Sequence, residues 1–399
     1  MNTVINKYNP NHLVKNKHKF AVNYIVASVP MILLFDWLFN LSIINLQIGL
    51  ILKALSIVFF CHLLITKKYK IKGFKFKNAI IYFIFLNFIY SLFSDNIVEN
   101  IYYTIRVSYW VLGTLVFYYL YSNAYFNTAA LRKMIMSTVL IASVFTIRLM
   151  INSDDHQNAS AYLILWCLPI LLNFKQSFIT KVLILFALVS IIITIKRGAL
   201  LALVISLFAF FIGVLKISRV LITKIRIIGI GLILISFIAL IFSSIWDRLS
   251  IRLEDTSGSG RDKLYQGLID KYTNGELHEL IFGFGINSVQ QYSKVLYGNY
   301  DKYSSGVAAH SDWFQYMFDF GVFGIIFMII LHYHFLKLLF LNFKNKTAIL
   351  PIVSMGYVIF SFTTAYSFIL NTPDAMFFGI VISVITAESI KIQSLKKYA

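Results

Sequence analysis

Charged residues are scarce in this chain. They make up 13% of its 399 residues, whereas hydrophobic residues make up 59% and the mean hydropathy is +0.76. Soluble domains usually hold about 25% charged and about 45–50% apolar residues. A soluble core cannot bury this much apolar surface. The composition therefore excludes an ordinary soluble globular fold and favours an integral membrane protein.

Cysteine and acidic residues are also few. The two cysteines, Cys61 and Cys167, lie in apolar segments, and neither has the spacing of a disulfide partner or a metal ligand. Asp and Glu number 17 against 36 Lys and Arg, which gives a net charge of +19. A basic chain can bind nucleic acid. Here, however, the basic residues stand in short linkers between apolar segments, as they do where they set membrane topology. We therefore expect no nucleic acid partner.

Long apolar segments account for most of the sequence. Segments of about 16–25 residues are long enough to cross a hydrocarbon core of ~30 Å as helices. We expect a single polytopic membrane domain over 1–399, an all-α fold of about twelve transmembrane helices with one large, partly helical periplasmic loop. No cleavable signal peptide is recognisable, so the first helix is expected to be its own targeting signal. The expected helices cover 20–36, 40–66, 79–94, 104–122, 133–151, 160–174, 181–195, 197–215, 226–244, 310–336, 347–367 and 376–392.

Basic and acidic linkers alternate between these helices. Lys and Arg fill the linkers at 7–19, 67–77, 132–133, 175–181, 216–226, 337–346 and 391–397. Acidic residues fill the alternate linkers at 95–99, 154–155 and 374. The positive-inside rule then places both termini in the cytoplasm of a bacterial inner membrane. The linker at 245–309 is much longer than the others and is external by parity. A linker of this length is usually functional or has its own structure.

The first candidate site is at Arg197. This arginine begins a helix at the external interface, beside Lys196, and Leu201 follows one turn later on the same face. An arginine here must snorkel or be paired. It is either an interfacial anchor or a clamp for an anionic ligand, and two adjacent cations on the side that normally avoids them favour the clamp.

The second candidate site is at Arg261, inside the long loop. A Gly/Ser run at 257–260 allows a tight turn, and apolar residues from Leu264 to Tyr272 then share one helical face, so we expect a helix to start near Gly260. Free N–H groups at such a start, together with Arg261, can bind phosphate. An ordinary capped surface helix is the alternative. The later Gly283-Phe-Gly285 sequence is expected to be a packing turn.

The third candidate site is at His310, where the loop ends and a transmembrane helix is expected to open. His310, Phe314, Met317, Gly321 and Gly324 are spaced as one continuous helical stripe, on which the glycines allow a neighbouring helix to approach closely. That packing would fix the direction of the imidazole, which can accept a proton near neutral pH. The alternative is an interfacial histidine in an aromatic belt.

Three further polar residues complete the candidate set. Arg106 and Arg148 lie near external helix ends and either add to a cationic cavity or anchor the helices. Asp312 either orients His310 or caps its helix. No cluster of His, Cys or carboxylates has metal-ligand spacing. There is also no phosphate-binding P-loop.

Together, these segments resemble the O-antigen ligase and polysaccharide polymerase superfamily of bacterial membrane glycosyltransferases. Its members carry Arg-x-x-x-Leu at an external helix end, as at Arg197 and Leu201. They carry His-[Asn/Ser/Gln]-x9-Gly-x-x-Gly after a long periplasmic loop, as at 310–324. Many also carry Ser-Gly-Arg with an aromatic residue four positions on, as at 259–261 and Tyr265, although Trp is usual there. The motifs cover about 190–330.

The resemblance implies metal-independent, inverting glycosyl transfer at the periplasmic face, without a cofactor. The donor would be a glycan on undecaprenyl diphosphate. The acceptor would be a lipid-linked repeat unit or lipid A-core. His310 would be catalytic, and Gly321 and Gly324 would serve helix packing. The diphosphate and substrate would be bound by Arg197, Arg261, Arg106, Tyr265 and Asp312. Besides the lipid bilayer, the resemblance allows a chain-length regulator as a further partner of this protein.

The resemblance leaves several activities open. The loop and the Ala-His-Ser-Asp-Trp sequence at 309–313 favour an O-antigen or capsular polysaccharide polymerase. The alternative is a ligase that moves finished O-antigen to lipid A-core, and a protein O-glycosyltransferase of the same superfamily comes after it. A lipid-linked oligosaccharide flippase would predict repeated halves and short external loops, which this sequence does not show.

Overall fold

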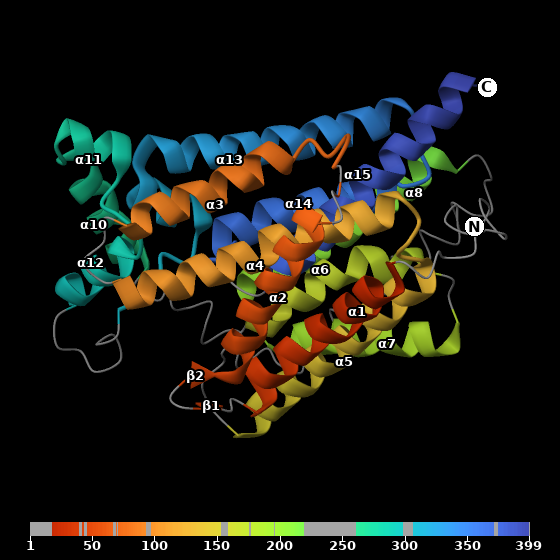
Figure 1. Ribbon diagram of the computed structural model, residues 1–399, viewed down its shortest axis with the longest axis horizontal. Helices are drawn as coiled ribbons and strands as arrows, with labels where there is room; N and C mark the ends of the chain where they lie inside the picture. Colours follow the sequence, from red (N-terminus) through yellow and green to blue (C-terminus); the bar gives the residue numbers. More distant parts are fainter. Residues whose placement is uncertain are drawn as a thin grey trace.

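The protein is a bundle of long, roughly aligned helices with three short helices at one end (Figure 1). It was analysed as a computed structural model, which describes residues 18–39, 42–43, 46–66, 69, 71–92, 97–152, 159–174, 177–194, 196–218, 261–297, 306–370 and 374–398. The elements before the long loop are α1 (Lys19–Leu33), the π-helical turn η3 (Leu34–Phe39), β1 (Ser42–Ile43), β2 (Leu46–Gln47), α2 (Ile48–Thr66), α3 (Lys77–Leu92), α4 (Ile97–Ser122), α5 (Thr128–Asn152), α6 (Ala159–Asn173), α7 (Phe178–Ile193) and α8 (Arg197–Ile217). The later elements are α10 (Arg261–Thr273), α11 (Leu277–Phe282), α12 (Ser288–Tyr297), α13 (Asp312–Lys344), α14 (Leu350–Tyr366) and α15 (Ala375–Tyr398).

Each expected helix has a counterpart except the one at 226–244, which lies outside the described residues. In the part of the chain that the structure describes, six helices are long and apolar enough to cross a membrane, and four further apolar helices are shorter. The all-helical membrane character is thus confirmed, whereas the count of twelve spans stays a prediction. The second helix starts at Ile48 rather than near residue 40, because a two-stranded hairpin, β1 paired antiparallel with β2, occupies the preceding residues.

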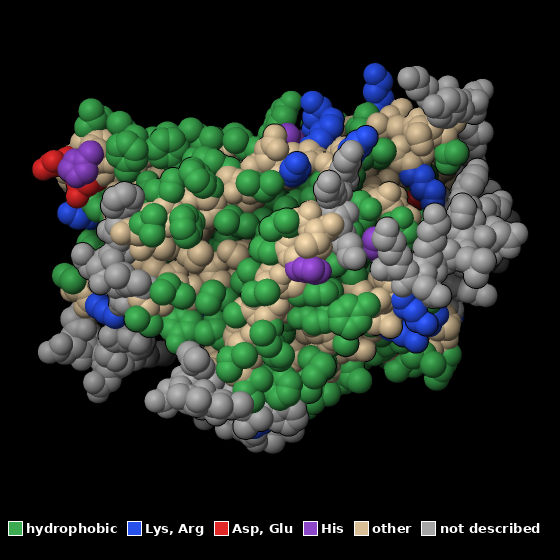
Figure 2. Space-filling model, viewed as in Figure 1, with side chains coloured by type: hydrophobic (Ala, Val, Ile, Leu, Met, Phe, Trp, Pro, Cys, Tyr) green, Lys and Arg blue, Asp and Glu red, His purple; other side chains and the backbone are tan. Residues whose placement is uncertain are grey.

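Apolar side chains cover the middle of the bundle (Figure 2). On the face shown, most Lys and Arg side chains gather at the end away from α10–α12. Large hydrophobic side chains are strongly exposed on several helices, among them Phe85, Phe178, Phe208 and Phe340. Exposed apolar surface of this extent suits contact with lipid rather than with water.

Two glycines allow the central helices to pack closely. A Cβ on Gly379 of α15 would overlap the hydroxyl of Thr114 on α4. A Cβ on Gly213 of α8 would lie 2.7 Å from Cα of Pro351 on α14. Small residues at helix crossings are the usual means of packing in membranes, where backbone approach replaces hydrophobic collapse. These crossings join α15 to α4 and α8 to α14, and the start of α8 and the end of α14 belong to the candidate site.

Candidate active site

The residue two positions before α13 adopts a constrained backbone. His310 has φ of +52°, in the left-handed region, and its side chain is partly exposed. α13 begins two residues later, at Asp312, with Ser311 as its N-cap. His310 therefore ends a segment without regular secondary structure rather than being the first residue of a helix. A positive φ is uncommon for a residue other than glycine and persists only where neighbouring contacts hold it.

Contacts on the C-terminal side of His310 join α13 to the end of α14. The carboxylate of Asp312 is buried and accepts hydrogen bonds from the backbone N–H groups of Ile369 and Leu370, at 3.4 and 3.3 Å. The hydroxyl of Ser311 donates to the carbonyl of Thr364, at 3.4 Å. Asp312 thus holds the segment that follows α14, and its expected contact with substrate stays a prediction.

The start of α8 lies against the same end of α14. Arg197 is the first residue of α8, as predicted. A Cβ on the next residue, Gly198, would lie 3.2 Å from Cβ of Tyr366, the last residue of α14, and 2.7 Å from the hydroxyl of Tyr162. The ammonium of Lys196 lies 4.5 Å from the centre of the Tyr162 ring. The backbone at Arg197 and the backbone at His310 therefore adjoin one helix end.

The start of α10 lies beside the start of α13. α10 begins at Arg261, close to the predicted position, and its Tyr265 ring stacks on Phe314 with centroids 4.4 Å apart. Leu264 and Leu268 are buried with Phe318 in a small separate core. The predicted apolar face thus packs α10 against α13 through Leu264, Tyr265, Leu268 and Tyr272, whereas Ile269, which was expected on the same face, is exposed. The side chains of Arg197 and Arg261 lie outside the described part of the structure. These two residues are therefore located by their backbone alone.

α13 is broken at Gly321, where φ is +59° and ψ is −138°. The carbonyls of Phe318 and Asp319 accept hydrogen bonds from the backbone N–H groups of Phe284 and Gly285, at 2.9 and 3.0 Å. The expected continuous stripe from His310 to Gly324 is therefore wrong, because the helix changes direction inside the motif. The prediction of a packing turn at Gly283-Phe-Gly285 is confirmed.

Both motif glycines permit close backbone approach at this break. A Cβ on Gly321 would lie 2.6 Å from the backbone N of Gly283 and from the carbonyl of Ile281, at the end of α11. A Cβ on Gly324 would overlap the carbonyl of Tyr316, eight residues back along the same chain. The close approach expected of Gly321 therefore exists, but its partner is the short loop helix α11. Gly324 serves the shape of α13 itself.

A buried polar network lies under the His310 segment. It comprises Tyr103, Ser288, Gln290, Gln315 and Asp319, and we call it the glutamine network. Sequence reasoning missed it. The signal that could have found it is the spacing of Asp312, Gln315 and Asp319, which puts three polar side chains on one face of an otherwise apolar helix.

A second buried group of charges lies near the α14–α15 junction. Lys53 of α2 and Asp36 of η3 form a buried ion pair with N–O distance 2.6 Å. Arg106 of α4 interacts electrostatically with Lys53. Burial, together with the nearby Asp36, raises the pKa of Asp374 to about 7, while Lys53 and Lys196 act in the opposite direction. Arg106 thus lies near charges of both signs. Lys53 and Asp36 were not expected from sequence.

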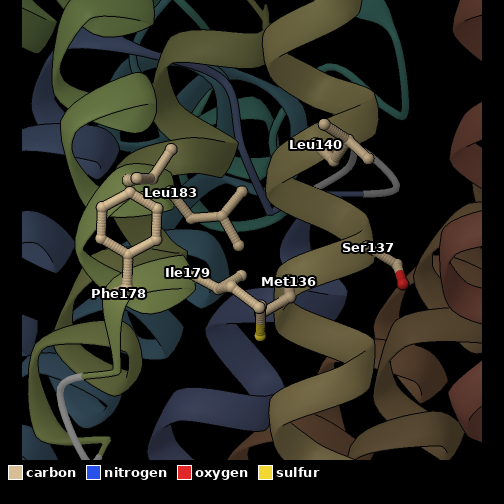
Figure 3. A pocket seen from close by; sticks show the side chains of 7 residues that line it. Met136, Ser137, Leu140, Phe178, Ile179 and Leu183 are labelled. Carbon is tan, nitrogen blue, oxygen red and sulfur yellow. The ribbon is translucent and has the colours of Figure 1, made fainter.

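An apolar pocket of about 410 Å³ lies apart from these residues, between α5 and α7 (Figure 3). Its lining includes Met136, Leu140, Phe178 and Leu183, with Ser137 at one edge. None of the motif residues lines it. Its chemistry suits a lipid chain and supplies no group for acid–base catalysis or phosphate binding.

The arrangement of the motifs can now be compared with known proteins. Residues 182–329 match the family model of the O-antigen ligase. The resemblance to the O-antigen ligase and polymerase superfamily is thereby confirmed for this part of the chain. The comparison with curated proteins finds no match.

The O-antigen ligase match runs from α7 to the middle of α13. It contains the start of α8, all of α10, α11 and α12, and the break at Gly321. Members of this superfamily are membrane glycosyltransferases, and the apolar helices agree with a multi-pass protein of the bacterial inner membrane. The matched stretch is therefore the part that brings the three motifs to one end of the bundle.

Proposed function

We propose that this protein is an O-antigen or capsular polysaccharide polymerase, which joins repeat units carried on undecaprenyl diphosphate. The observation that supports this most directly is the grouping of three helix starts. α8 and α13 begin at Arg197 and Asp312 beside the end of α14 and the segment after it, and Tyr265, one turn into α10, stacks on Phe314 of α13. Helix N-termini bind anions through their free N–H groups, so this end suits a diphosphate.

The proposed reaction uses His310 as the general base. An acceptor sugar hydroxyl attacks the anomeric carbon of the donor glycan while the bond from that carbon to the diphosphate oxygen breaks. The anomeric configuration inverts, the hydroxyl proton passes to the imidazole, and undecaprenyl diphosphate leaves. Arg197 and Arg261 would hold the diphosphate and stabilise its developing charge. Tyr265 would position α10, and Arg106 would add positive charge nearby.

The proposed orientation places the reaction on the periplasmic side. The linkers rich in Lys and Arg belong in the cytoplasm by the positive-inside rule, as do both termini. The end of the bundle with α10–α12 is then external, and the donor can enter it sideways from the bilayer. Asp312 is assigned to holding the α13–α14 junction, because its carboxylate is buried and already bonded there.

A ligase is the second candidate function, because the matched family model is itself described as O-antigen ligase. Polymerase and ligase use the same donor and differ in the acceptor. Deletion of the gene separates them through the lipopolysaccharide that remains. Core carrying a single repeat unit would support the polymerase. Core alone, with long glycan left on undecaprenyl diphosphate, would support the ligase, and unchanged lipopolysaccharide and capsule would contradict both.

A further inference from the structure

The glutamine network contacts the chain one residue before His310. Oε1 of Gln315 accepts a hydrogen bond from the backbone N–H of Ala309, at 3.1 Å. Both Ala309 and Gln315 are buried. On the other side of His310, Ser311 and Asp312 are bonded to the end of α14 and the segment after it. His310 therefore lies between two anchored residues, and the Gln315 contact is the anchor on the loop side.

Gln315 is itself held by two acceptors. Its Nε2 donates to Oδ2 of Asp319 at 2.8 Å and to Oε1 of Gln290 at 3.2 Å. Nε2 of Gln290 in turn donates to the hydroxyl of Tyr103 on α4, at 2.7 Å. Because both N–H groups of the Gln315 carboxamide are already hydrogen-bonded, only its oxygen is available to Ala309. The orientation of the Gln315 side chain is therefore fixed.

Asp319 connects this contact to the loop helices. Its Oδ1 accepts from the hydroxyl of Ser288 at 2.9 Å, and the backbone N–H groups of Asn287 and Val289 also donate to its carboxylate. The carboxylate thus caps the start of α12, where a negative charge is favoured. One buried side chain therefore holds both Gln315 and the first turn of α12.

We propose that Gln315 and Asp319 are positioning residues for His310, coupling the docked loop helices to the direction of the imidazole. This role in catalysis rests on the proposed function, in which His310 receives the proton. Neither residue reaches the reacting atoms, since both side chains are buried. They act by fixing the backbone at Ala309, and a catalytic side chain requires such support to hold its geometry. A left-handed residue such as His310 needs neighbours that are held on both sides.

The proposal is tested by three variants of the full chain in lipid nanodiscs. Gln315→Met removes both the contact with Ala309 and the donors. Asp319→Asn keeps the volume and changes the charge that caps α12. The control is Asn342→Leu, which removes a buried carboxamide from the same helix, where it bonds to Leu338 and Ser389 about 40 Å further along. The control loses comparable buried hydrogen bonds far from His310.

The first readout is the rate at which diethyl pyrocarbonate modifies His310, measured on its peptide by mass spectrometry. The exposed His278 in the same sample serves as the reference. We expect Gln315→Met and Asp319→Asn to raise the His310 rate by about fivefold, the factor given by loss of one ordinary hydrogen bond, with no rise in Asn342→Leu. Equal His310 rates in all four proteins would overturn the proposal. Should Gln315→Met not fold, the isosteric Asp319→Asn variant decides.

The second readout is glycosyl transfer from a purified lipid-linked glycan. A positioning role predicts that kcat falls by about tenfold or more while KM for the donor changes by less than about threefold. A fall in kcat no larger than that of Asn342→Leu would contradict the positioning role. The modification rates need no enzyme activity. Failure of the proposed function, seen as full transfer by His310→Ala, is therefore distinguishable from failure of this inference.

Discussion

The ring of Tyr265 stacks on the ring of Phe314, with centroids 4.4 Å apart and planes 13° apart. Tyr265 stands one turn after Arg261 in α10, and Phe314 stands four residues after His310. This contact, together with the packing of Leu264 and Leu268 on Phe318, holds the start of α10 beside the start of α13. An aromatic residue at position 265 follows from this packing, which Phe or Trp could also provide.

The first prediction concerns this stacked pair. Tyr265→Ala should lower transfer by about tenfold or more, because α10 loses its aromatic contact with α13. Tyr265→Phe should retain most of the activity, since it keeps the ring that stacks on Phe314. Steady-state transfer by the purified variants measures both. Equal activity of the Ala and Phe variants would show that the stacking does not position α10.

The second prediction concerns the break in α13. Gly321→Ala should destabilise the protein by about 3 kcal/mol or more, because it combines a positive φ with overlap against the end of α11. Gly285→Ala is the matched control. Its φ is also positive, at +97°, but no atom lies within 4 Å of the added Cβ. The control should cost only about 1 kcal/mol. Thermal unfolding in detergent compares them, and equal losses would contradict the packing at Gly321.

The third prediction concerns the buried pair of Lys53 and Asp36. Lys53→Met leaves a buried carboxylate without its partner and should cost about 3–5 kcal/mol. Adding Asp36→Leu should recover much of that loss, because a buried ion pair and an apolar pair are often of similar stability. Tm values of the single and double variants give the answer. A double variant less stable than Lys53→Met would show that Asp36 stabilises the protein in another way than by pairing with Lys53.

The fourth prediction concerns pH. Because burial raises the pKa of Asp374 from 3.8 to about 7, the folded protein favours its protonated form. The raised pKa of Asp374 therefore stabilises the folded protein fully below about pH 4, where the carboxyl group is protonated. This stabilisation is lost as the pH rises towards about 7. The Tm of the wild type should therefore fall over this interval more than the Tm of Asp374→Asn. Parallel Tm curves for the two proteins would contradict the shift.

The sequence predicted the elements whose signal is local. The starts of α8 and α10 follow from a change in hydropathy and a Gly/Ser run. The buried side chains of Leu264 and Leu268 follow from helical spacing. Each of these features depends on residues within a few turns, and the structure places them as expected.

Features that depend on distant segments were not predictable. The break at Gly321 exists because the backbone N–H groups of Phe284 and Gly285, from a segment far earlier in the chain, donate hydrogen bonds to the carbonyls of Phe318 and Asp319. The helical spacing of residues in the sequence cannot show that these carbonyls accept hydrogen bonds from another segment. Likewise, Gln290 meets Tyr103 only because α12 docks beside α4. The spacing of Gln315 and Asp319 revealed a polar face but not its partners.

The role of His310 is tested by measuring transfer by purified His310→Ala, with His278→Ala on the exposed helix α11 as the control. Both proteins are reconstituted with a lipid-linked glycan donor and acceptor, and chain growth is followed at equal protein concentration. We predict that His310→Ala loses transfer by at least about 10²-fold, the usual contribution of a general base, while His278→Ala keeps it. Wild-type chain growth by correctly folded His310→Ala would show that His310 is not the general base.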